Sequence, residues 1–285
     1  DGENIHYQKF NRGDYDEPVK IIGTTKKRGT KVRFRPDGEI FHKVEFKFNI
    51  LQERLREQAF LNAGLKISLG DFRNEDELLY EEYKFDGGIK SYIEWLNKKK
   101  GAEPLHDDII YLSGTVDDVA VEVAFQYTTD FNSEVFRSFA NNIHTVDGGT
   151  HEVALKKALN KVINDYIKNS KDSAPAKKGK KIKEDEPYVA LSGEAIREAI
   201  NAIISVKLPE CEFEGQTKGK LGNPEVSPIV YRLVTEQLTY YFEENPETAK
   251  IIMNKSITAQ QARDAAKKAM EAKRKSVLDG GGLPG

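Results

Sequence analysis

The sequence of 285 residues lacks the features that place a protein outside the cytoplasm. Its single cysteine, Cys211, has no second cysteine with which to form an internal disulfide. No apolar run approaches the roughly 18 residues that a membrane span needs, and no charged-then-apolar segment opens the chain. These absences argue against a disulfide-stapled secreted domain and a membrane protein, and they predict a cytoplasmic location.

The chain also lacks an excess of charge of either sign. Lys and Arg number 44 and Asp and Glu 46, so the net charge is −2, although charged residues make up 32% of the chain. Any affinity for nucleic acid must therefore come from local basic clusters and not from the overall field. With 38% hydrophobic residues, the chain can bury one core and part of a second.

The two ends of the sequence are typical of a piece of a longer polypeptide. The first residues are Asp-Gly-Glu-Asn, without an initiator methionine. The last are DGGGLPG, a Gly/Pro-rich stretch that is more typical of a linker than of the end of a domain. We therefore expect a fragment.

Hydrophobic periodicity predicts interleaved strands and helices. Alternating or β-branched runs predict strands at 5–10, 19–23, 30–36, 64–72, 78–85, 108–115, 119–128, 138–145 and 203–209, the fourth and fifth forming a hairpin. Helical spacing predicts helices at 49–62, 87–100, 150–166, 193–203, 224–244 and 246–278. Asn49, Thr150, Ser192 and Asn245 are the candidate N-caps.

Two segments differ sharply in this pattern. The helix after Thr150 has the clearest apolar stripe, which needs a sheet or another helix to cover it: Leu155, Ala158, Leu159, Val162, Ile163 and Tyr166. The segment 171–187 has five lysines between Lys177 and Lys183 and no large apolar residue except Ile182. It is predicted to be a loop outside the core.

The stretch FEGQTKGKLGN, residues 213–223, has the composition of a phosphate-binding loop but not the spacing of a P-loop. One residue too few separates Gly215 from Gly219, and Leu221 stands where a metal-binding hydroxyl should follow the lysine. A second stretch, GTTKKRGTK at residues 23–31, has one residue too many between its glycines and fails as well. The first loop still offers an ammonium, an amide and a hydroxyl to an anionic phosphate, from Lys218, Gln216 and Thr217. From these residues alone, a plain surface turn remains the alternative.

Together with its neighbours, this loop resembles the QTK loop of the ATPase subunit of bacterial type IIA DNA topoisomerases, the family of DNA gyrase B and its topoisomerase IV counterpart. GTKVRFRPDGEIF (29–41) resembles the last strand of the ATP-binding domain, and FDGGIKSYIEWLN (85–97) the start of the transducer. FANNIHTVDGGTHEVALKKAL (139–159) and REAINAIISVKLPECEFEGQTKGKLGN (197–223) continue the match, and ARDAAKKAMEAKRKSVLDGGGLPG (262–285) resembles the long exit helix. The resemblance covers nearly the whole chain in order.

The resemblance implies an α+β fold with three parts. Residues 1–43 would be the C-terminal strands of a GHKL ATPase domain. Residues 44–223 would form a transducer core like domain 2 of ribosomal protein S5, which is a mainly antiparallel sheet with helices on one face. Residues 224–285 would be C-terminal helices leading toward a TOPRIM domain.

The resemblance also implies a role in an ATP-dependent DNA topoisomerase. ATP and Mg²⁺ would be bound mainly by an upstream ATPase region, so no catalytic residue is expected in this chain and the chain alone should be inactive. Gln216 and Lys218 would contact the ATP γ-phosphate and so couple ATP binding and hydrolysis to DNA gate closure and strand passage. The implied partners are a second ATPase subunit, the DNA-cleaving subunit in an A2B2 heterotetramer, and double-stranded DNA.

Basic clusters are candidates for contact with DNA phosphates. They are Lys98, Lys99 and Lys100, the loop from Lys177 to Lys183, and Lys267, Lys268, Lys273, Arg274 and Lys275. A solvated charged face has the same composition, so solvation is the competing interpretation.

Other chemistry-bearing residues favour structural roles. His151 and Glu152 lack the second histidine of a zinc-protease motif, and His106, Asp107 and Asp108 are too close in sequence to converge on one ion. We therefore predict no metal site. Cys211 is expected to be inert, and Trp95, Phe125, Tyr127 and Phe131 are expected to pack in the core or on a sheet face.

Two alternative functions remain open from the sequence. An S5-like fold also suits a non-enzymatic module that binds nucleic acid or protein, because fold does not settle function. A self-contained nucleotide hydrolase is the other alternative, which an ATPase assay of this chain would test. The sequence does not separate gyrase from topoisomerase IV.

Overall fold

The computed structural model describes residues 2–73, 78–131, 133–170 and 190–279, the last five without their side chains. The chain divides into two compact units, Asp1–Leu51 and Gln52–Gly285, and each is described by itself. The predicted Lys-rich loop at 171–187 lies outside the described residues.

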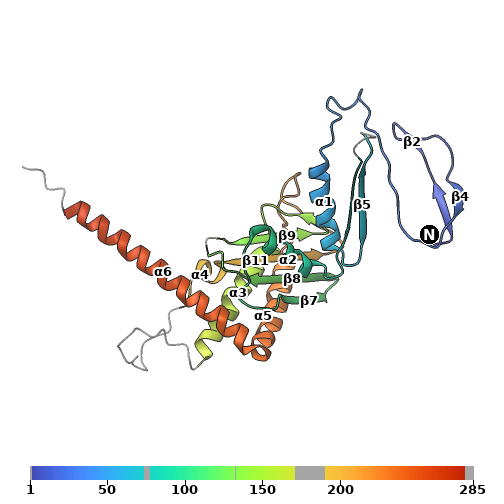
Figure 1. Cartoon of the computed structure of the whole chain (residues 1–285). Helices are drawn as coiled ribbons and strands as arrows, with labels where there is room; N and C mark the ends of the chain where they lie inside the picture. The colour runs from blue at the N-terminus through green and yellow to red at the C-terminus, as the bar shows by residue number, and fades with distance from the viewer. Residues whose placement is uncertain (1, 74–77, 132, 171–189, 280–285) are drawn as a thin grey trace, which may run out of the picture. The chain divides into compact units, whose positions relative to one another are not determined.

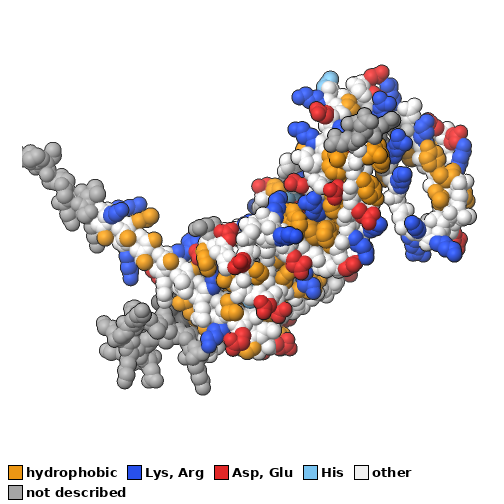
Figure 2. All heavy atoms as spheres, viewed as in Figure 1, with side chains coloured by type: hydrophobic (Ala, Val, Ile, Leu, Met, Phe, Trp, Pro, Cys, Tyr) orange, Lys and Arg blue, Asp and Glu red, His pale blue; other side chains and the backbone are white. Residues whose placement is uncertain are grey.

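The first unit consists of short antiparallel pairs. Strand β1 (Asn4–Tyr7) pairs with β4 (Lys20–Thr24), and β2 (Phe10–Asn11) pairs with β3 (Asp14–Tyr15). Large hydrophobic side chains of this unit are exposed, and Figure 2 shows hydrophobic atoms on its surface. The exposed residues include Tyr7, Phe10, Tyr15, Val19, Ile21, Ile22, Val32 and Phe34. The unit therefore has no hydrophobic core among its described residues.

The strand predicted at 30–36 is not formed, because the described backbone from Thr30 to Pro36 is irregular. Alternating Val32 and Phe34 satisfy the strand pattern, but no described strand pairs with this segment. A strand without a ladder partner leaves its backbone N–H and C=O groups to water and gains nothing over an irregular chain.

The second unit is built on one five-stranded sheet in the order β10-β9-β11-β8-β7. Its strands are β7 (Ile110–Val116), β8 (Val119–Tyr127), β9 (Val135–Ala140), β10 (Ile143–His144) and β11 (Ile200–Lys207). All neighbouring pairs are antiparallel except β9 and β11. The α+β class and the mainly antiparallel sheet are thus confirmed.

Helices pack on both faces of this sheet (Figure 1). Along β8, Val121, Val123 and Phe125 point into the larger cluster with α3 (Thr150–Asn169) and α5 (Val226–Glu244). The intervening Ala124 belongs to a second cluster with α2 (Ile89–Lys100) and the end of α1 (Phe48–Leu61). The prediction of helices on one face was therefore incomplete, because the apolar stripe of α2 is buried against the opposite face.

The predicted hairpin is also confirmed, as β5 (Lys66–Asp71) paired with β6 (Leu79–Lys84). Residues 74–77, between the two strands, lie outside the described residues. At the end of α2, Gly101 adopts φ 64°, a left-handed conformation that closes the helix after its three lysines.

Two predicted helix starts were wrong in detail. Helix α3 has Gly149 at its N-cap position, so Thr150 is the first helical residue and does not cap the helix. Asn49 lies inside α1, which begins at Phe48. The cap at Ser192 is confirmed, since its side chain accepts a hydrogen bond from the Ala195 N–H at 3.2 Å.

The helix predicted at 193–203 is shorter than its periodicity suggested. Helix α4 covers only Gly193–Arg197, and β11 begins three residues later. Ala199 has φ 62° and breaks the helix, after which β-branched residues enter the middle of the sheet. The last helix, α6 (Pro246–Asp279), begins and ends close to where the sequence predicts.

Candidate functional site

Strand β11 leads out of the sheet into the loop that carries Gln216, Thr217 and Lys218. These three side chains are exposed at the tip of the loop. Below the tip, Phe213 and Leu221 form an antiparallel bridge, and the Glu214 N–H donates to the Lys220 carbonyl at 2.9 Å. The tip is therefore presented by a closed, hairpin-like stem.

The stem is fastened to the beginning of α3. Leu221 is fully buried and lies in parallel register with Gly149. Its N–H donates to the Gly148 carbonyl at 3.1 Å, and its carbonyl accepts from the Thr150 N–H at 3.1 Å. Gly149, with φ 148°, permits this approach, because a Cβ there would lie 2.6 Å from the Leu221 carbonyl oxygen.

Asn223 closes the base of the loop. Only 2% of this residue is exposed. Its Oδ1 accepts from the Glu212 N–H at 2.7 Å, and its Nδ2 donates to the Glu210 carbonyl at 3.2 Å and to Glu225 Oε1 at 2.7 Å. One buried amide thus satisfies three groups of the loop and holds its two ends together.

The two lysines of the loop have different surroundings. The Lys220 ammonium lies 3.0 Å from Glu214 Oε2 in an ion pair. In the described part of the chain, no side-chain hydrogen bond or ion pair engages Lys218 or Gln216. Lys218 also has φ 55°, a conformation that is uncommon outside glycine and is often found at functional positions. Lys218 is therefore the cation of this loop that can donate to an external anion.

Cys211 lies at the start of the same loop. Burial raises the pKa of its thiol, and the nearby charge of Lys218 opposes that shift. A thiol with a raised pKa is a poor nucleophile.

A buried polar group lies behind the stem, where α3 begins. His151 is fully buried, and burial lowers its pKa to about 4. Its Nε2 lies 3.2 Å from Thr145 Oγ1, and Ser138 Oγ donates to Glu152 Oε2 at 2.7 Å. These contacts fit the helix-start role predicted for His151 and Glu152.

The lysines at the end of α2 are mostly engaged with protein groups. Lys99 lies 4.0 Å from Glu53 Oε1 and 4.8 Å from the centre of the Trp95 ring. Lys100 donates to Ser133 Oγ. Lys98 is exposed. The DNA role of this cluster stays a prediction, and Lys98 is the member best placed for it.

The basic residues of α6 are presented differently. Every described side chain from Gln261 to Arg274 is exposed, including Lys267, Lys268, Lys273 and Arg274. Figure 2 shows basic and hydrophobic side chains side by side along this part of the helix. The side chain of Lys275 and the loop from Lys177 to Lys183 are not described. The structure does not bring the described basic residues of α6 together with the loop at Lys218.

Neither a metal centre nor a membrane segment is found in the described residues. They contain no group of three His, Cys, Asp or Glu side chains that could hold an ion, and no helix long and apolar enough to cross a bilayer. His106 has a structural role, because its Nε2 accepts from the Tyr127 N–H at 3.1 Å and its Nδ1 lies 2.8 Å from the Asp108 carbonyl oxygen.

Sequence reasoning missed two residues of the site, Gly149 and Asn223. The Gly-Gly pair directly before a strongly predicted helix was the only local signal for the first. Nothing local indicates the second, because its three hydrogen-bond partners depend on how the loop closes.

The chain is similar to known proteins along most of its length. The model of the DNA gyrase B family matches residues 88–272. DNA gyrase B of Clostridium acetobutylicum is 45% identical over 284 residues, which are 99% of this chain and 42% of that protein. DNA gyrase B of Staphylococcus aureus strain MRSA252 is 45% identical over 285 residues, with the same coverage of 99% and 42%. The chain thus spans less than half the length of these relatives.

Two solved structures are similar in fold. The 43K ATPase domain of Thermus thermophilus gyrase B, in complex with an aminocoumarin, has a TM-score of 0.77 and 37% identity, covering 95% of this chain and 69% of that one. The topoisomerase IV ATP-binding domain of Francisella tularensis, in complex with a small-molecule inhibitor, has a TM-score of 0.67 and 29% identity, covering 92% and 67%.

Proposed function

The chain belongs to the DNA gyrase B family, and from this premise we propose that it is the transducer part of the ATPase subunit of a type II DNA topoisomerase. In this proposal residues 1–43 complete a GHKL ATPase domain, 44–223 form the transducer core, and 224–285 lead toward a TOPRIM domain. ATP and Mg²⁺ are bound mainly by the upstream ATPase region, so this chain alone is inactive.

The loop at Lys218 carries the proposal. Its stem is held by Leu221 and Asn223, while the Lys218 side chain is exposed and not engaged by the described residues. A lysine contact to the γ-phosphate exists only while that phosphate exists, so its loss on hydrolysis changes the balance between two domain arrangements. One such charge-assisted hydrogen bond contributes roughly 1.5–3 kcal/mol, which biases such an equilibrium without locking it.

The coupled process is DNA gate closure and strand passage. The partners are a second ATPase subunit, the DNA-cleaving subunit in an A2B2 heterotetramer, and double-stranded DNA, and the compartment is the cytoplasm. The names of the similar proteins support the assignment to a type II DNA topoisomerase. The exposed basic residues of α6, Lys267, Lys268, Lys273 and Arg274, are the best-placed candidates for contact with DNA phosphates.

The test is ATP turnover by the intact ATPase subunit carrying Lys218→Ala. We expect turnover to fall by about 10²-fold or more, as it does when a donor to transition-state charge is lost. Lys220→Ala is the matched control, because the same charge is removed from the same loop but its ammonium is already paired with Glu214.

The control should retain turnover within about twofold, since a paired surface lysine contributes little. Near-normal turnover in Lys218→Ala would refute the γ-phosphate contact. Equal losses in both variants would show that the loop depends on its total charge and not on Lys218.

A further inference from the structure

Helix α6 holds the short helix α4 through a buried lysine. Only 8% of Lys255 is exposed. Its Nζ donates to the Ala195 carbonyl at 3.0 Å and lies 3.5 Å from the Ile196 carbonyl oxygen. These carbonyls are at the end of α4, where helix carbonyls lack intrahelical partners. The same ammonium lies 5.1 Å from the centre of the fully buried Tyr127 ring, whose hydroxyl donates to the Ile196 carbonyl at 3.0 Å.

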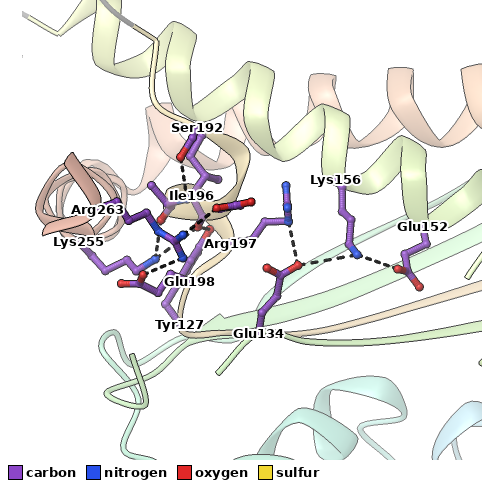
Figure 3. A network of polar contacts seen from close by, with 12 residues as sticks. Tyr127, Glu134, Glu152, Lys156, Ser192, Ile196, Arg197, Glu198, Lys255 and Arg263 are labelled. Atoms are coloured by element: carbon purple, nitrogen blue, oxygen red, sulfur yellow. Dashed lines mark hydrogen bonds and ion pairs between the residues drawn. The ribbon is translucent and has the colours of Figure 1, made fainter. Parts of the chain in front are cut away.

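Farther along α6, two more side chains hold α4 at the surface, and Figure 3 shows one of them, Arg263, beside Glu198. Gln260 Oε1 accepts from the Ser192 N–H at 2.9 Å, directly before α4. Arg263 Nη1 lies 2.8 Å from Glu194 Oε2, and its Nη2 lies 3.3 Å from Glu198 Oε2. We call the contacts of Lys255, Gln260 and Arg263 with residues 192–198 the α4 clamp.

The clamp lies at one end of the central strand. After α4 the chain turns at Ala199, whose N–H donates to the Ser133 carbonyl at 2.7 Å, and enters β11. All residues of β11 except the last are buried, and the strand is paired on both sides. At about 3.3 Å per residue, its eight residues span roughly 25 Å.

The loop with Lys218 lies beyond the other end of β11. There the Leu208 N–H donates to Asn141 Oδ1 at 2.9 Å, and Asn141 Nδ2 donates to the Leu208 carbonyl at 2.8 Å, which fixes the exit of the strand. Residues 208–223 then form the loop. One continuous buried strand therefore joins the α4 clamp to the stem below Lys218.

A row of alternating charges makes a second connection between the same two places (Figure 3). Arg197 Nε, in α4, lies 2.9 Å from Glu134 Oε1, and Lys156 Nζ lies 3.8 Å from the same oxygen. Lys156 is also 2.8 Å from Glu152 Oε1, at the start of α3. A Cβ at Gly148 would lie 3.2 Å from the Glu152 carboxylate, beside the bridge to Leu221.

The clamp is also where α6 leaves the rest of the second unit. Ala259 is its last buried residue, and every described side chain from Gln261 to Arg274 is exposed. The direction of the exposed part is therefore set by the segment of α6 that contacts the core and α4.

We propose that the α4 clamp is the joint that positions α6 according to the state of the Lys218 loop, with β11 as the connecting element. This inference rests on the proposed function, since it assumes that the loop responds to nucleotide and that α6 passes the response on. In this proposal Lys255 and Arg263 are positioning residues, which act through α4 and not by contact with nucleotide or DNA.

The lysine at the buried position has an energetic cost beside its hydrogen bonds to α4. Burial lowers the pKa of Lys255 to about 8, so holding its charge at neutral pH costs free energy of folding. An apolar side chain of similar length would fill the site without that cost. We therefore expect Lys255→Met to fold.

The experiment uses the intact ATPase subunit assembled with its DNA-cleaving subunit, and it compares ATP turnover with DNA strand passage. In Arg263→Glu and in Lys255→Met we expect ATP turnover to stay within about twofold while the number of strand passages per ATP falls by about tenfold, in the range of typical coupling free energies. Arg263 is exposed, so its variant tests the joint even where Lys255→Met unfolds.

Exchanging the charges of Arg263 and Glu198 tests whether the ion pair itself supports strand passage. Adding Glu198→Arg to Arg263→Glu recreates an ion pair across the clamp and should restore most of the lost strand passage. Arg232→Glu, an equal charge change at an exposed site on α5, is the control and should leave both activities unchanged.

The proposal would be wrong if strand passage fell only in proportion to ATP turnover. It would also be wrong if the double variant made no more strand passages per ATP than Arg263→Glu alone. Normal turnover in Lys218→Ala would instead refute the nucleotide contact. The two failures are therefore distinguishable.

Discussion

The two units of the chain contain similar hydrophobic side chains but bury them very differently. Phe34, in the first unit, is 66% exposed, whereas Phe139, in the second, is fully buried. The second unit has helices packed on both faces of its sheet, while the first offers only short strand pairs and no covering layer among its described residues. The comparison shows that a hydrophobic pattern becomes a core only where the chain itself supplies the opposing surface.

The largest effect on stability is expected from removing a buried phenylalanine ring of the second unit. Phe139→Ala should lower the free energy of unfolding of the second unit by about 3–5 kcal/mol, because a cavity replaces a buried ring. Phe34→Ala should change it by less than about 0.5 kcal/mol. The measurement is urea unfolding followed by the fluorescence of Trp95, the only tryptophan, which packs against the same cluster. Equal losses in the two variants would contradict the contrast between the units.

The stability of the second unit is expected to depend on pH, because burial lowers the pKa of His151. Its pKa is lowered from 6.5 to about 4 in the folded state. Between these two pH values the imidazole is therefore protonated in the unfolded chain but neutral in the folded chain. The folded state therefore has its full stability above pH 6.5. As the pH falls toward 4, the free energy of unfolding decreases by up to about 3 kcal/mol. Trp95-monitored unfolding at pH 7 and pH 5 measures this loss.

His151→Gln should flatten the pH dependence, whereas His42→Gln, at an exposed position of the first unit, should not. The slope that remains in His151→Gln would come from His106 and His144, whose pKa values burial also lowers. An unchanged slope in His151→Gln would disprove the assignment.

A smaller effect is expected from two glycines. Gly149→Ala should destabilise the second unit by about 1–3 kcal/mol, because the new Cβ would meet the backbone of Leu221 at a φ of 148°. Gly38→Ala, in a turn of the first unit with open space around it, should stay within about 0.5 kcal/mol. Amide hydrogen exchange at Leu221 and Thr150 checks whether the stem detaches, and unchanged exchange would argue that the stem is held elsewhere.

Much of the second unit could be predicted from the sequence. The stripes of α2 and α3, the hairpin of β5 and β6, and strands β7 and β8 follow from period and length alone. The single strand predicted at 138–145 was wrong, because the chain turns at Asn141 and Asn142, with φ values of 46° and 65°, and forms two strands, β9 and β10. The helix predicted from periodicity at 193–203 was too long, because the helical spacing of apolar residues continues into β11. There the pairing of β11 with both β8 and β9 outweighed local helix propensity, and pairing between distant segments cannot be seen in a local pattern.

Some residues of the candidate site could likewise be predicted from the sequence, and others could not. Gln216 and Lys218 could be found because loop chemistry and the family resemblance both indicate them. Gly149 and the α4 clamp could not, because each acts through residues distant in sequence. Asn223 could not, because its partners in the loop meet only when the loop closes. In the sequence, Lys255 is one of many helix lysines, and only its contact with α4 distinguishes it.

The order of strands in the sheet has a consequence for synthesis. Strands β8 and β9 are made early but do not pair with each other, since β11 lies between them and is the last strand of the sheet to leave the ribosome. Until residue 207 emerges, both carry an open edge that another strand could occupy. A nascent chain stalled before β11 should therefore be a target for chaperones, and one stalled well after it should not.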